Sequence, residues 1–81
     1  MGAMLNLHRV RLFVIAARHE NFTRAAEALH ISQPAVSTQI RRLEHDMGVK
    51  LIAHDGREIR LTEAGQVFLE YAEKILALCR E

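Results

Sequence analysis

Apolar residues recur every three or four positions along much of the chain, which is the spacing of amphipathic helices. The first such stretch covers about residues 6–19, and its apolar positions are Leu7, Val10, Phe13, Val14 and Ala17. Residues three and four apart share one face of a helix, so this stretch predicts a helix with one buried side. Asn6 is expected to cap it, because an asparagine side chain can accept the unpaired N–H groups of a first turn.

Two further helices joined by a short turn are predicted between residues 23 and 47. Thr23 is a candidate N-cap for the first of them, and the alanines that follow it would let another helix approach closely. The expected turn is residues 30–32, with Ile31 pointing inward and Ser32 capping the next helix.

The second helix of this pair is expected to bury a narrow stripe and to present a polar, basic face. Pro34 suits its first turn, where the missing N–H costs nothing, and Gly48 suits a left-handed residue just past its end. The stripe consists of Val36, Ile40, Leu43 and Met47. The opposite face carries Pro34, Thr38, Arg41, Arg42 and His45, flanked by Ala35 and Ser37. Two helices, a turn and such a face are typical of a helix-turn-helix that binds DNA.

The spacing then changes to short β-prone runs at residues 49–52 and 58–61, on either side of residues 54–57. Asp55 and Gly56 lie between these runs, and an Asp-Gly pair in that position is a strong hairpin signal. A two-stranded hairpin beside a helix-turn-helix would form a wing.

Thr62 is expected to cap a final long helix whose apolar stripe is too wide for the core of so small a domain. The stripe holds Ala64, Phe68, Tyr71, Ala72, Ile75, Leu78 and Cys79, widened by Val67 and Leu76. A second copy of the chain is therefore expected to cover it, with a dimer interface formed by Phe68, Tyr71, Ala72, Ile75, Leu76 and Cys79.

The predicted fold is mainly α: a winged helix-turn-helix of three helices and a two-stranded wing over residues 4–62, followed by a linker or dimerisation helix over residues 63–81. Residues 1–3 resemble a remnant left by an expression vector. The helical pattern reaches the last residues, which suggests that the chain is a fragment of a longer protein.

Charge supports a nucleic-acid partner once it is divided along the chain. The net charge of the 81 residues is only +1, but residues 1–62 hold nine Lys or Arg against six Asp or Glu. Residues 63–81 hold two against four. Phosphate contact requires a locally basic surface rather than a basic average, and the first segment can supply it.

Other classes of function find little support in the sequence. The single cysteine, Cys79, cannot form an internal disulfide, and no apolar run approaches the length of a membrane span. The five histidines lack zinc-site spacing and are expected at surface or boundary positions, and no catalytic motif stands out. We therefore expect neither an enzyme nor a metal or cofactor site, no membrane contact, and a cytoplasmic, nucleoid-associated protein.

Three segments carry a family resemblance: residues 22–37, residues 39–44, and Arg60-Leu61-Thr62-Glu63-Ala64-Gly65. Together they resemble the N-terminal domain of LysR-type transcriptional regulators, over residues 4–80. The resemblance implies a winged helix-turn-helix that binds double-stranded DNA, with a linker helix that dimerises antiparallel to its mate. It also implies a C-terminal domain, absent from this chain, that binds a small-molecule effector, and tetrameric full-length assemblies.

The resemblance also assigns candidate DNA contacts. The base-reading residues would be Gln33, Pro34, Ala35, Ser37 and Thr38. The backbone and wing contacts would be Thr23, Arg24, Ser32, Arg41, Arg42, Arg57 and Arg60. Two positions depart from the family pattern: Thr38 stands where many relatives have Arg, and residues 52–54 replace the usual Phe-x-Arg of the first wing strand.

Plainer readings remain open for several of these residues. Thr23, Ser32 and Gln33 are also plausible capping residues, and Arg41 and Arg42 could form a solvated face paired with Glu44 or Asp46. The wing arginines could simply keep an edge strand soluble. The alternative functions are a winged-helix module for protein association and a member of another winged-helix regulator family, such as the molybdate-responsive one.

Overall fold

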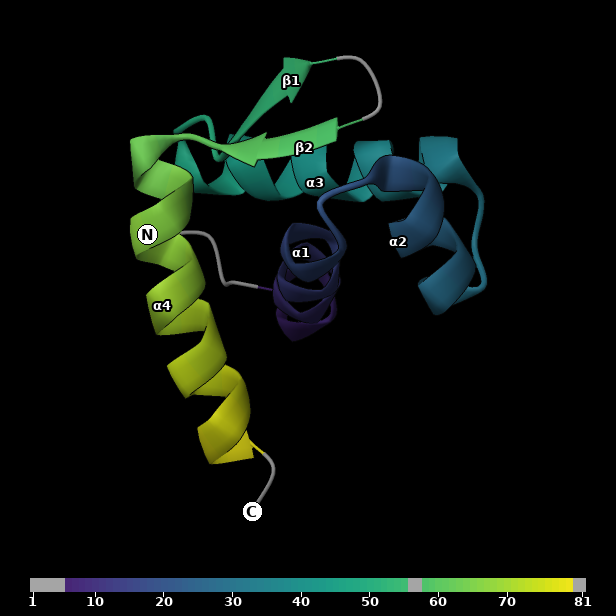
Figure 1. The fold of residues 1–81 in the computed structure, drawn as a ribbon. Coiled ribbons are helices and arrows are strands. Elements are labelled where there is room, and N and C mark those ends of the chain that lie inside the picture. The colour runs from purple at the N-terminus through teal and green to yellow at the C-terminus, as the bar shows by residue number, and fades with distance from the viewer. Residues whose placement is uncertain (1–5, 56–57, 80–81) are drawn as a thin grey trace.

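The computed structural model describes residues 6–55 and 58–79, which form four helices and a two-stranded antiparallel sheet (Figure 1). The elements are α1 (Leu7–His19), α2 (Phe22–Leu29), α3 (Gln33–Met47), β1 (Ile52–Asp55), β2 (Glu58–Leu61) and α4 (Glu63–Cys79). The predicted mainly α winged helix-turn-helix with a long last helix is therefore confirmed. The suggested remnant at residues 1–3 and the Gly56-Arg57 part of the turn lie outside the described residues.

Side chains cap the starts of the first two helices, although one of them is not the residue expected. Asn6 caps α1 as predicted, because its side chain accepts the N–H groups of His8 and Arg9. The N-cap of α2 is Asn21, which accepts the N–H of Arg24 at 3.0 Å. The assignment of this cap to Thr23 was wrong: the extended backbone of Asn21 starts the helix at Phe22, so Thr23 lies inside the first turn.

Three helices end on a residue in the left-handed conformation. Gly48 closes α3 with φ 72°, as predicted, whereas Glu20 and His30 adopt φ values of 57° and 58° after α1 and α2. Ile31, which follows His30, was expected to point inward, but its side chain is exposed. The left-handed His30 ends α2, and the Ile31 N–H returns to the carbonyl of Ala26, so Ile31 belongs to the closing turn of that helix.

The core forms around α1, which lies beneath α3 and between α2 and α4 (Figure 1). The larger fully buried side chains of the core are Val10, Leu12, Phe13, Val36, Leu43, Leu51 and Ile52. The ring of Phe13 meets that of Phe68 from α4 at 5.3 Å between centroids, a separation at which tilted aromatic pairs attract. The stripe predicted for α3 is confirmed, with Met47 partly buried at its end.

The wing is a hairpin whose register pairs Ile52 with Leu61 and Asp55 with Glu58. Its first strand was expected at residues 49–52 and instead begins at Ile52. The difference has a physical cause, because the N–H groups of Leu51 and Ile52 are taken by the side chain of Glu44 from α3. The wing also joins the α1–α2 turn, where the Ile59 N–H donates to the carbonyl of Glu20 at 3.0 Å.

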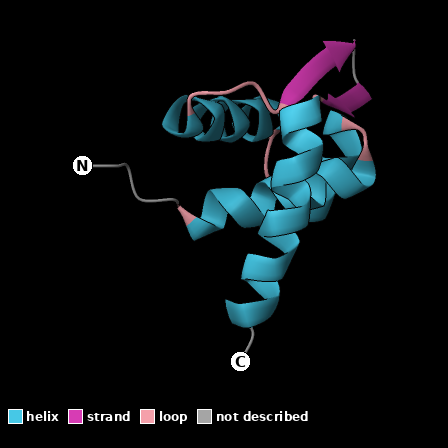
Figure 2. Ribbon diagram, turned by 90° about the vertical axis from the view of Figure 1, so that its left-hand side faces the viewer, coloured by secondary structure: helices cyan, strands magenta, loops and turns pink. Residues whose placement is uncertain are grey.

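Thr62 caps α4 as predicted, with its hydroxyl oxygen accepting the Gly65 N–H at 3.0 Å. Beyond this cap, α4 packs against α1, and its C-terminal end extends past the rest of the domain (Figure 2). No helix in the described part of the chain combines the length and the apolar character needed to cross a membrane.

Burial of the inner face of α4 shows that part of the expected dimer interface lies in the core of the domain itself. Phe68 and Ala72 are buried in the domain's own core, and Leu76 packs against that core. Phe68 and Ala72 are therefore covered by the same chain and not available to a second copy, whereas Leu76 is only partly buried. The sequence pattern could not separate the two faces, because both are apolar.

Candidate nucleic-acid interface

The N-terminal end of α3 is fixed by Ser32 and exposed to solvent. The Ser32 hydroxyl oxygen accepts the N–H of Ala35 at 3.2 Å, which confirms its role as the N-cap. Gln33 and Pro34 are exposed immediately after it. This end of α3 therefore presents side chains that can reach a ligand in front of the helix.

Gln33 is held by a residue of the preceding helix. The hydroxyl of Thr23 lies 3.3 Å from Oε1 of Gln33, and donates to it. The amide nitrogen of Gln33 keeps both of its N–H groups for other partners. Thr23 thus lies beside the predicted base-reading residue, although it is not the cap of α2.

The remaining predicted base-reading residues are half-buried along α3. They are Ala35, Ser37 and Thr38, and each is partly accessible. Thr38 lines a cleft of about 390 Å³ with Arg9, Arg41, Arg42, His45 and Asp46. Three guanidinium groups and a single carboxylate make this part of the surface basic.

Arg41 and Arg42 are exposed, and the acids expected to pair with them are engaged elsewhere. Glu44 is buried and accepts the Leu51 and Ile52 N–H groups, while Asp46 forms an ion pair with Arg9 at 3.1 Å. Neither Arg41 nor Arg42 forms an ion pair or a side-chain hydrogen bond within the described residues. The reading of these arginines as a paired, neutralised surface is therefore not what the structure shows.

Two other predicted backbone contacts are exposed on neighbouring elements. Arg24 is exposed in the first turn of α2. Arg60 is exposed on β2 and faces the same way as Glu58, while Ile59 between them is buried. Arg57 lies outside the described residues, so its predicted role in the wing is not placed.

Arg9 and Glu44 form contacts with α3 or from it that the sequence pattern did not predict. Arg9 bridges α1 and α3, and its partner Asp46 is 37 positions away, so no local spacing signals the pair. Glu44 had a signal that could have been used. It follows Ile40 by four residues and thus lies beside the buried stripe, where a carboxylate requires partners.

The sequence pattern that defines the bacterial regulatory helix-turn-helix proteins of the lysR family matches residues 7–66. The chain belongs to the LysR family. The match spans the helix-turn-helix, the wing and the start of α4. It confirms the predicted resemblance, and the domain is the DNA-binding domain of a LysR-type transcriptional regulator.

Relatives and solved structures of LysR-type regulators agree with this assignment. The chain is 51% identical over 75 residues to a probable RuBisCO transcriptional regulator of Thalassiosira pseudonana, covering 93% of this chain and 24% of that protein. It is 53% identical over 74 residues to the HTH-type transcriptional regulator BudR of Klebsiella aerogenes, covering 91% of this chain and 52% of BudR. The chain thus spans about a quarter of the first of these relatives and about half of the second.

A crystal structure of the CbnR DNA-binding domain in complex with DNA superposes with a TM-score of 0.88 at 40% identity, covering 93% of this chain and 86% of that one. The complex of the BenM DNA-binding domain with catB site 1 DNA gives a TM-score of 0.88 at 36% identity, covering 94% of this chain and 82% of that one. These LysR-type domains share the whole described fold.

The outer face of α4 carries exposed apolar side chains, as the dimer prediction requires. Val67, Tyr71 and Leu78 are exposed by 52%, 59% and 75%, and Ile75 between them is partly buried. Their spacings of four, four and three place them on one stripe of the helix, beside the buried face that holds Phe68. Cys79 is exposed in the last turn. Of the residues predicted for the interface, Tyr71 and Cys79 are therefore exposed, and Ile75 and Leu76 are partly accessible to a partner.

Proposed function

We propose that this domain reads base sequence in the DNA major groove through the N-terminal half of α3. The reading residues are Gln33, Pro34, Ala35, Ser37 and Thr38. The observation that carries the proposal is the exposed, capped start of α3, where the hydroxyl of Thr23 donates to Oε1 of Gln33. A glutamine amide at such a position can form paired hydrogen bonds with adenine. A major groove admits such a helix, and readout by side chains near its N-terminus is the usual geometry of a helix-turn-helix.

Phosphate contacts come from the basic side chains around this end of the domain. Arg42 and Arg41 lie one to two turns beyond the reading residues without an acidic partner in the described chain. Arg24 lies in the first turn of α2, and Arg57 and Arg60 belong to the wing, which approaches the flanking minor groove or its phosphates. Such contacts set register and affinity, and carry no base preference of their own.

The domain acts as one half of a homodimer that is joined through α4. Val67, Tyr71, Ile75 and Leu78 form an apolar stripe that the domain itself leaves exposed. In the full-length protein a further domain binds a small-molecule effector, and two dimers associate into a tetramer. No cofactor is required by the DNA-binding domain. A bacterial regulator of this kind works in the cytoplasm, where the chromosome lies.

A selection of bound sites from a random duplex pool tests the reading surface. The unaltered chain should enrich a sequence, and Gln33→Ala should lower its affinity for that sequence by about 1 to 3 kcal/mol while leaving scrambled duplex almost unchanged. Glu27→Ala, at an exposed position of α2, is the matched control and should change neither affinity. An equal loss on both duplexes would contradict the reading role of Gln33.

The competing function is protein association through the apolar stripe of α4, with DNA irrelevant. Titration with random duplex at low salt separates the two, because the basic surface around Arg41 and Arg42 requires measurable non-specific binding. Sedimentation of Tyr71→Asp against the unaltered chain tests the stripe separately, and we expect this variant to shift any dimer toward monomer.

A further inference from the structure

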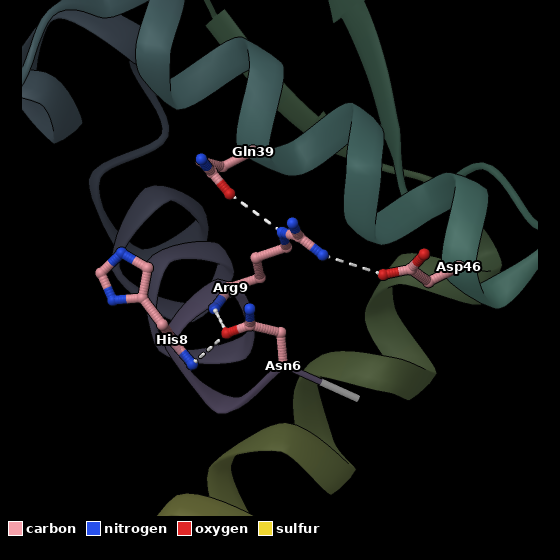
Figure 3. Close-up of polar contacts among 5 residues, drawn as sticks. All are labelled: Asn6, His8, Arg9, Gln39 and Asp46. Carbon is pink, nitrogen blue, oxygen red and sulfur yellow. Dashed lines mark hydrogen bonds and ion pairs between the residues drawn. The ribbon is translucent and has the colours of Figure 1, made fainter. Parts of the chain in front are cut away.

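Arg9 of α1 reaches across to α3 and forms two hydrogen bonds with it (Figure 3). Its Nε donates to Oε1 of Gln39 at 2.9 Å, and its Nη1 donates to Oδ2 of Asp46 at 3.1 Å. The side chains of Arg9 and Asp46 are only 21% and 24% exposed, so water screens this ion pair only partly.

The two partners lie on one flank of α3, two helical turns apart. Asp46 follows Gln39 by seven positions, which corresponds to about 10 Å along a helix axis. A single planar guanidinium group therefore holds both ends of a two-turn segment. Apolar contacts set how closely two helices approach but are not directional, whereas guanidinium hydrogen bonds fix direction.

The backbone of Arg9 is also fixed. Asn6 accepts the backbone N–H groups of His8 and Arg9, so the side chain of Arg9 starts from a capped turn of α1 (Figure 3). Gln39 immediately follows Thr38, the last of the proposed reading residues. Rotation of α3 about its axis would move Thr38 and break the bond to Gln39 at the same time.

We propose that Arg9 is a positioning residue for sequence recognition, setting the rotation and tilt at which α3 presents its reading face to DNA. This inference rests on the proposed function. In this proposal Arg9 acts through Gln39 and Asp46, which accept the N–H groups of its Nε and Nη1, and the adjacent carboxylate of Asp46 repels a phosphate. The loss of Arg9 should therefore reduce sequence discrimination more than overall affinity.

The test measures the ratio of two affinities, for a duplex that the unaltered chain selects from a random pool and for a scrambled duplex of the same composition. Unfolding of a fraction of the protein lowers both affinities equally, so the ratio reports recognition and not stability. Arg9→Met should lower the ratio about tenfold, comparable with the loss of one paired base contact, and leave the salt dependence of binding unchanged.

Arg18→Met is the matched control. It removes the same charge from the same helix and breaks an ion pair with Glu73 of α4, but it touches no residue of α3. Its ratio should equal that of the unaltered chain. Arg9→Lys keeps the charge but holds one partner at a time, and Asp46→Asn removes the ion pair. Both variants should therefore lower the affinity ratio by a smaller factor than Arg9→Met. They replace Arg9→Met in the test if that variant does not fold.

An unchanged ratio in Arg9→Lys and Asp46→Asn, and in Arg9→Met where it folds, would overturn the proposal. If Arg9→Met left the affinity ratio unchanged but reduced the salt dependence of binding by the amount expected for one phosphate contact, the proposal would be overturned in favour of direct DNA contact by Arg9. Failure of the unaltered chain to select any sequence would instead overturn the proposed function, so the two failures are distinguishable.

Discussion

The Oε2 atom of Glu44 accepts the backbone N–H of Leu51 at 2.8 Å, linking the recognition helix α3 to the start of the wing. The same oxygen accepts the N–H of Ile52 at 3.0 Å. All three residues are buried, so a single carboxylate oxygen satisfies two backbone donors that water cannot reach. This side chain is therefore a direct hydrogen-bonded link between α3 and the start of the wing.

Glu44→Ala should destabilise the domain by about 2 to 4 kcal/mol, because it leaves two buried N–H groups without an acceptor. Urea unfolding followed by circular dichroism measures the change. Glu44→Gln keeps an oxygen at the same position and should recover most of the loss. Equal destabilisation by both variants would show that the negative charge matters rather than the acceptor.

Gly65→Ala should also destabilise the domain, by about 3 kcal/mol, because an added Cβ would overlap the backbone carbonyl of Leu51. Gly48→Ala is the matched control. A Cβ at Gly48 meets no atom within 4 Å, so the only cost is the left-handed backbone with φ 72°. This conformation should lower the stability of Gly48→Ala by about 1 kcal/mol. If the two variants unfolded at the same urea concentration, that result would contradict the close contact between Gly65 of α4 and the carbonyl of Leu51.

His30→Gly should stabilise the domain by about 0.5 to 1 kcal/mol. His30 holds a φ of 58° at an exposed position, and glycine adopts this conformation without a steric penalty. His45→Gly, in the interior of α3, should instead cost about 1 kcal/mol, since its backbone is helical. Thermal unfolding of both variants measures the difference, and a loss of stability in His30→Gly would contradict the strained conformation.

Arg42→Met should reduce the salt dependence of DNA binding by about one unit in the slope of log K against log salt. Arg42 is exposed and has no acidic partner among the described residues, so a phosphate can replace its hydration shell. Arg18→Met should leave the slope unchanged. Fluorescence anisotropy with a labelled duplex at several salt concentrations provides the measurement, and an unchanged slope for Arg42→Met would place this arginine off the DNA.

Thr23→Val should weaken base discrimination several-fold, because it removes the hydroxyl that holds Oε1 of Gln33. Thr23→Ser keeps the hydroxyl and should behave like the unaltered chain. The affinity ratio between the selected and scrambled duplexes reports the effect. A reduced ratio in Thr23→Ser with an unchanged ratio in Thr23→Val would mean that the methyl group of Thr23, and not its hydrogen bond, supports Gln33.

Local patterns were sufficient for most of the elements. The buried stripe of α3 and the caps at Asn6, Ser32 and Thr62 follow from side-chain spacing and from the unpaired N–H groups of a first turn, which depend on neighbouring residues alone. The family assignment likewise needed only the order of residues. The reading face of α3 could be placed from the same periodicity.

Tertiary contacts decided the rest, because they join residues that no sequence period connects. The N–H groups of Leu51 and Ile52, at the start of the first wing strand, are taken by Glu44, and Arg9 reaches Asp46 across 37 positions. Both faces of α4 are apolar in sequence, and only packing against α1 showed that Phe68 lies inside the core and Tyr71 outside it. The sequence alone determined that α3 carries the polar, basic face proposed to read DNA, whereas the packing of α1, the wing and α4 decided how that helix is held.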